Sequence, residues 1–171
     1  ALMCAEVRKL AVGGKGEAPL AVRDHLGRSE PIFPQTARAL RESPEERNLI
    51  VHALRNSDER IAQGKPVTPA FLYAALLWPA LERRLRKLQE REQLPLAAAM
   101  YEAASEVVVE QCRSTTIPRR FSTPMREIWD LHQRLIGRRS PQKLAAHPRF
   151  RAAYDFILLR EQSGEDLNLS L

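Results

Sequence analysis

The sequence predicts an all-α protein, folded as an irregular multi-helix bundle of about 7–9 helices. Apolar residues recur about every three or four positions through almost every segment, which is the spacing of one face of a helix. A helix-start signal, a side chain that can cap followed by proline, occurs at Ser43-Pro44, Thr68-Pro69, Thr123-Pro124 and Ser140-Pro141. The chain of 171 residues is long enough to bury a hydrophobic core.

Glycine and proline divide the first half of the chain into helices. Two short helices are predicted before residue 27, with a glycine turn between them, and a further turn of helix is predicted around residues 37–40. Ser43 and Glu46 form a capping box, so a longer helix should begin there and run to about residue 63. Its buried face is predicted to consist of Leu49, Ile50, Ala53, Leu54 and Ile61.

A long helix is predicted for residues 68–93, apolar as far as Leu81 and charged after it. Its first half should therefore be central, and the run of mixed charges should be a solvated face. Pro79 should kink this helix or divide it in two, because proline lacks a backbone donor. The next helix starts near Pro95, and its apolar side is predicted to comprise Ala98, Tyr101, Ala104, Ser105, Val108 and Val109.

Two further helices are predicted in the last third of the chain. The first should follow Thr123-Pro124, with one face formed by Met125, Ile128, Trp129, His132, Leu135 and Ile136. Because Trp129 and His132 lie within this apolar face, we interpret both as core residues rather than as base-stacking or catalytic ones. The last helix should follow Pro148 and carry Phe150, Ala153, Tyr154, Ile157 and Leu158. The acidic segment after Gly164 has little to anchor it.

Positive charge is concentrated between Arg113 and Arg151. This stretch holds nine arginines and one lysine against Glu127 and Asp130, a local excess of +8, although the whole chain carries only +6. Arginine forks match phosphate oxygens in pairs, so the patch favours a polyanion such as a nucleic acid. The alternatives are a solvated helix face and a surface that docks an acidic protein.

The candidate site therefore consists of these basic side chains, for which we predict one contiguous face. They are Arg113, Arg119, Arg120, Arg126, Arg134, Arg138, Arg139, Lys143, Arg149 and Arg151. The sequence predicts no metal site, because the four histidines are scattered and the two cysteines have no metal-type spacing. Two free thiols are typical of a reducing cytoplasm, and no apolar run is long enough to cross a membrane. The chain opens without methionine inside an apolar-periodic segment, so we interpret it as part of a longer protein.

Three segments resemble bacterial poly(A) polymerases. IPRRFSTPMREIWDLHQRL, followed by HPRFRAAYDFILLR, is similar to the C-terminal region of that family, and KPVTPAFLYAALLWPALE is similar to its central helical body. EVRKLAVGGKG, with PIFPQTARAL after it, resembles the end of the neck. The resemblance implies three parts: 1–42 as the end of the neck, 43–116 as the body, and 117–171 as a basic RNA-binding region with an acidic tail.

The resemblance implies a template-independent enzyme that adds AMP from ATP to RNA 3′ ends, with a divalent metal such as Mg²⁺. That chemistry needs clustered carboxylates, whereas the aspartates here are isolated. We therefore expect no catalytic, cofactor-binding or metal-binding residue in this chain, which should be inactive alone. Its expected partners are single-stranded RNA 3′ ends and a catalytic head domain of the same protein, with no membrane. The alternatives are the C-terminal half of a CCA-adding tRNA nucleotidyltransferase and a helical scaffold for an acidic protein.

Overall fold

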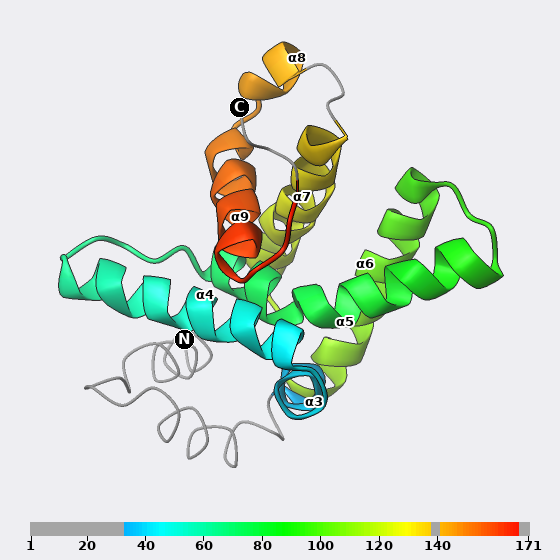
Figure 1. The fold of residues 1–171 in the computed structure, drawn as a ribbon, viewed down its shortest axis with the longest axis horizontal. Coiled ribbons are helices and arrows are strands. Elements are labelled where there is room, and N and C mark those ends of the chain that lie inside the picture. Colours follow the sequence, from blue (N-terminus) through cyan, green and yellow to red (C-terminus); the bar gives the residue numbers. More distant parts are fainter. Residues whose placement is uncertain (1–32, 138–140, 168–171) are drawn as a thin grey trace.

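Figure 1 shows the computed structural model of the chain, which describes residues 33–137 and 141–167. Within these residues the fold is all-α, with seven helices and no strand, which confirms the predicted fold class. The helices are α3 (Pro34–Glu42), α4 (Pro44–Ala62), α5 (Pro69–Arg91), α6 (Leu96–Ser114), α7 (Arg119–Ile136), α8 (Pro141–Ala145) and α9 (Phe150–Gln162). The helices and the glycine turn predicted before residue 27 lie outside the described residues.

The helices pack as two antiparallel pairs, which contact each other through α5 (Figure 1). One pair is α5 with α6, and the other is α7 with α9. Helix α5 also contacts α3, α4, α7 and α9, so it is the element on which the others assemble. The short α8 contacts α7 and lies at the outer end of the second pair (Figure 1).

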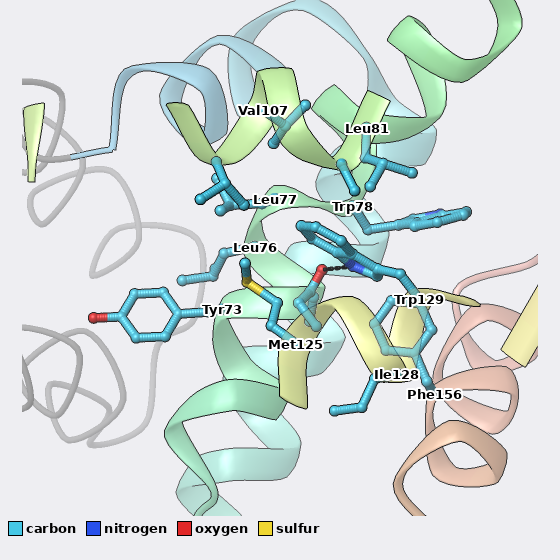
Figure 2. Packing of buried hydrophobic residues seen from close by; sticks show 14 of the residues in the cluster. Tyr73, Leu76, Leu77, Trp78, Leu81, Val107, Met125, Ile128, Trp129 and Phe156 are labelled. Atoms are coloured by element: carbon cyan, nitrogen blue, oxygen red, sulfur yellow. Dashed lines mark hydrogen bonds between the residues drawn. The ribbon is translucent and has the colours of Figure 1, made fainter. Parts of the chain in front are cut away.

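The core is built around the first half of α5, as the sequence predicts. Every residue from Leu72 to Pro79 is buried, because neighbouring helices cover this part of α5 on all sides. Figure 2 shows Trp78 of α5, Trp129 of α7 and Phe156 of α9 within one cluster. This cluster contains residues from both sides of the predicted boundary at residue 117. The division into neck, body and basic region stays a prediction.

The start of α4 confirms half of the predicted capping box. The Ser43 side chain accepts a hydrogen bond from the backbone N–H of Glu46, at 3.3 Å. The return bond is absent, because the Ser43 N–H donates to the Ala39 carbonyl, at 3.3 Å, and the Glu46 carboxylate pairs with Arg83 of α5. Glu46 therefore joins two helices instead of closing its own helix end.

Proline positions in two helices differ from the sequence prediction. Helix α7 begins at Arg119, after Pro118, so the predicted start at Thr123-Pro124 is wrong and Pro124 lies inside the helix. Helix α5 runs without a break through Pro79, so the predicted division in two is wrong, and the alternative of a kink stays a prediction. Both prolines are buried, and the packing of the apolar residues around them outweighs the backbone hydrogen bond that each removes.

The predicted buried face of α6 is rotated from the observed one. Its buried residues are Ala99, Met100, Ala103, Ala104, Val107, Val108 and Gln111. Tyr101 and Val109, placed on the predicted apolar side, are exposed, as are Ile61 of α4 and Tyr154 and Leu158 of α9. Helix α6 is rich in alanine and valine on several sides, so periodicity alone did not define which side packs on α5.

The charged second half of α5 is not simply a solvated face. Arg83 pairs with Glu46 of α4 and lies 3.2 Å from the Glu42 carboxylate at the end of α3. The next residue, Arg84, pairs with Glu106 of α6. Two successive arginines thus connect α5 to different neighbouring helices. No helix in the described part of the chain is both long and apolar enough to cross a membrane.

Candidate nucleic-acid interface

Several of the described basic residues lie around the two ends of α7, and Arg126 lies near its middle. Arg119 and Arg120 form its first turn, and Arg113 lies in the last turn of α6. Arg134 lies in the last turn of α7, 15 residues or about 22 Å along the helix from Arg119. Lys143 of α8 follows this end of α7 in the chain. Arg138 and Arg139 lie outside the described residues, so the contiguous face stays a prediction.

Four of the predicted residues pair with carboxylates. Arg113 lies 2.8 Å from Glu110, and Arg134 lies 3.4 Å from Asp130. The other two pairs involve α9: Arg149 lies 3.1 Å from Glu127 of α7, and Arg151 lies 3.0 Å from Asp155. All eight side chains are at least 38% exposed, so water screens these pairs and each arginine stays open to another anion.

Four other predicted residues form no ion pair with any described residue: Arg119, Arg120, Arg126 and Lys143. The Arg120 guanidinium lies over the Phe121 ring, 4.9 Å from its centroid, which leaves its N–H groups available. The first turn of α7 contains no acidic residue and no side-chain cap. The positive end of the helix dipole therefore adds to the charge of Arg119 and Arg120.

Arg126 is held in place by a neutral partner. Its guanidinium donates a hydrogen bond to the Ser105 hydroxyl of α6, at 3.1 Å, and that hydroxyl donates to the Tyr101 carbonyl, at 2.9 Å. Since one guanidinium carries five N–H donors, most donors of Arg126 stay free for a ligand. The contact also shows which side of α6 faces α7. The positioning role of Ser105 was not predicted, because the helical spacing placed Ser105 on the apolar side of α6.

A buried charged cluster lies at the junction of α5, α7 and α9. Arg160 is only 5% exposed, and its guanidinium lies over the Trp78 ring, 4.8 Å from the centroid. Both its Nε and Nη2 atoms donate to the Glu165 carboxylate, at 3.1 and 2.6 Å. Glu82 of α5 lies farther away, at 3.9 Å. The segment after Gly164 is therefore anchored at Glu165, which corrects the prediction of a loose tail.

The histidine of this cluster was predicted as a core residue from the sequence, whereas the arginine was not. His132 is completely buried, and its Nδ1 lies 3.1 Å from the Ile128 carbonyl, which confirms a hydrogen-bonded core residue. Its Nε2 accepts from Arg160, at 3.2 Å, which requires a neutral ring that donates from Nδ1. The missed signal was the spacing of Ala153, Ile157 and Arg160, which places the arginine on the buried face of α9.

The pH dependence of stability should report this neutral histidine. Burial, together with the neighbouring Arg160 charge, lowers the pKa of His132 to about 3. The unfolded chain takes up this proton below about pH 6.5, whereas the folded protein does so only near pH 3. Stability should therefore fall as the pH drops below 6.5, by about 2 kcal/mol at pH 5.

Urea unfolding at pH 7, 6 and 5 measures this loss, with His132→Gln as the control. Burial raises the pKa of Glu82, so that carboxyl takes up a proton in the folded state and opposes the trend. Because both proteins contain Glu82, Glu165 and Arg160, the difference between their pH profiles isolates the histidine. Parallel profiles for the parent and His132→Gln would contradict a neutral, buried imidazole.

The chain matches known proteins across this whole region. Residues 92–170 match the family model described as polymerase A arginine-rich C-terminus. The chain is 39% identical over 145 residues to poly(A) polymerase I of Escherichia coli O6:H1, which covers 82% of this chain and 31% of that protein. It is 32% identical over 171 residues to poly(A) polymerase I of Haemophilus influenzae, covering 96% and 38%. It thus spans about a third of the length of these relatives, and it belongs to the bacterial poly(A) polymerase family.

Proposed function

We propose that this chain is the helical part of a polyadenylating enzyme that holds RNA 3′ ends, and that it binds them through their phosphates. The observation that carries the proposal is the set of cations around α7 without an acidic partner among the described residues. Arg119, Arg120 and Arg126 belong to this set, and the charges of Arg119 and Arg120 add to the positive end of the helix. The names of the relatives support RNA as the polyanion.

Phosphate contacts suit this role because they carry little sequence information, and such an enzyme must accept many 3′ ends. In the same proposal, ATP and Mg²⁺ act at a catalytic head domain of the whole protein. Within residues 33–137 and 141–167, no group of three or more His, Cys, Asp or Glu side chains could hold a metal ion. We therefore propose no catalytic step for any described residue.

The salt dependence of binding tests the phosphate contacts. If Arg119, Arg120, Arg126 and Lys143 each neutralise one phosphate, the logarithm of the affinity should fall with the logarithm of salt at a slope of about −3. Reversal of Arg119 and Arg120 to glutamate should weaken binding to all RNA sequences alike and reduce that slope by at least about 1. Fluorescence anisotropy with labelled single-stranded RNA at several salt concentrations measures both effects.

Arg86 and Lys87 of α5 provide the matched control. They are also adjacent and exposed, but they lie on a helix outside the predicted site. Their reversal to glutamate makes the same change in net charge and should affect RNA binding much less. If both double reversals changed the affinity and the slope equally, only the total charge would matter. If reversal of Arg119 and Arg120 changed neither quantity, the acidic-protein alternative would gain support.

A further inference from the structure

Tyr101 is an exposed aromatic residue on the side of α6 that faces α7. Its side chain is 74% exposed, more than any other large hydrophobic side chain among the described residues. Residues four positions apart share one side of a helix, so Tyr101 lies one turn before Ser105 on the same side. Because Ser105 contacts Arg126 of α7, at 3.1 Å, this side is turned toward α7.

Tyr101 lies toward the N-terminal end of α6, one turn before the contact between Arg126 and Ser105. Its 74% exposure shows that no described helix covers the phenol ring. Proteins that bind single-stranded nucleic acids combine exposed aromatic rings, on which bases stack, with cations that contact the phosphates. Tyr101 and the anchored Arg126 guanidinium provide one group of each kind.

The charges around Tyr101 favour an anionic ligand. Arg119 lies two turns, or about 10 Å, before Arg126 on the same side of α7, so two cations without an acidic partner among the described residues follow one line. The nearby carboxylates are paired: Asp130 with Arg134, and Glu106 with Arg84. Glu102 projects from α6 about 100° away from Tyr101, and its charge acts on Arg84.

We propose that Tyr101 stacks on a base of bound RNA while Arg126 and Arg119 hold the adjoining phosphates. This inference rests on the proposed RNA binding and adds a contact to the base itself. Any base presents a face for stacking, so the contact adds affinity without selecting a sequence. The Ser105 hydroxyl is the positioning group, because it fixes Arg126 relative to the turn of α6 that carries Tyr101.

The test separates base contacts from phosphate contacts with two oligomers of equal length. One is a labelled single-stranded oligoadenylate, and the other has the same ribose–phosphate chain without bases. Tyr101→Ala should weaken binding of the chain to the oligoadenylate roughly tenfold. The oligomer without bases should bind the parent and Tyr101→Ala equally, and the salt slope should not change because tyrosine is uncharged. Tyr101→Phe keeps the ring and should bind like the parent.

Tyr154 of α9 is the matched control. It is also an exposed tyrosine, at 44%, but its ring stacks on Phe150, with 6.4 Å between the centroids. Tyr154→Ala should bind both oligomers like the parent. The proposal is overturned if Tyr101→Ala binds oligoadenylate like the parent, or if it loses affinity equally for the oligomer without bases. If the parent itself shows no salt-dependent binding to RNA, the proposed function is overturned together with this inference. A failure of the Tyr101 variants alone overturns only the stacking contact.

Discussion

Replacement of Trp129 by alanine should lower the free energy of unfolding by about 3–5 kcal/mol. Trp129 is completely buried between α5 and α9, as Figure 2 shows. Its indole N–H donates to the Ala74 carbonyl of α5, at 3.0 Å, so the residue both fills space and links two helices. Alanine would leave a large cavity at the point where the two helix pairs meet, and the surrounding helices could close it only in part.

Urea unfolding followed by far-ultraviolet circular dichroism measures this effect without using the tryptophan as the probe. Trp129→Phe fills most of the space but lacks the N–H, so it should lose clearly less stability than Trp129→Ala. A different result would be informative. If Trp129→Ala unfolded at the parent's urea concentration but no longer bound RNA, Trp129 would be a base-stacking residue and its assignment to the core would be wrong.

Replacement of Glu165 by alanine should lower stability by about 2–3 kcal/mol. The substitution would leave the buried Arg160 guanidinium without its close carboxylate, with only Glu82 at 3.9 Å and the neutral His132 nearby. A buried charge that loses its partner keeps its desolvation cost but loses the compensating attraction. Because about a third of the Glu165 side chain is exposed, the loss should be smaller than for a fully buried pair.

Asp155→Ala is the matched control for this prediction. Asp155 also accepts from an arginine, Arg151, at 3.0 Å, but that arginine is 86% exposed. An exposed pair of this kind contributes little, so Asp155→Ala should change stability by less than about 1 kcal/mol. Thermal or urea unfolding of both variants gives the comparison. Equal losses in the two variants would show that burial of Arg160 does not make its ion pair more important.

The sequence predicted the helical class and the position of the core because long apolar segments and capping residues are local signals. The first half of α5 was identified from its continuous apolar run, and the apolar face of α7 was identified from spacing. The orientation of α6 was not, because alanines and valines on several sides make its possible buried faces nearly equivalent. Contact with α5 and α7 decides between these faces, and such contacts are not encoded in local periodicity.

The sequence predicted which basic residues form the candidate site, but not which of them form ion pairs with carboxylates. The surplus of arginine is visible in the sequence, but the sequence does not show that Glu127 of α7 meets Arg149 beside α9. Nor does it show that Arg126 meets a serine instead of a carboxylate. These partners are far apart in the chain and adjacent only after folding. The division of the arginines into paired and unpaired groups therefore required the three-dimensional arrangement.

The bond between Arg160 and Glu165 has a consequence for local opening of the protein. The last turn of a helix near a chain end usually frays, and its amide hydrogens exchange quickly with solvent. Here that turn of α9 is connected through Arg160 to the side chains of Trp78 and His132 in the interior. Amides near residue 160 should then exchange only when the junction of α5, α7 and α9 opens, so hydrogen exchange at the end of α9 would follow that of the core.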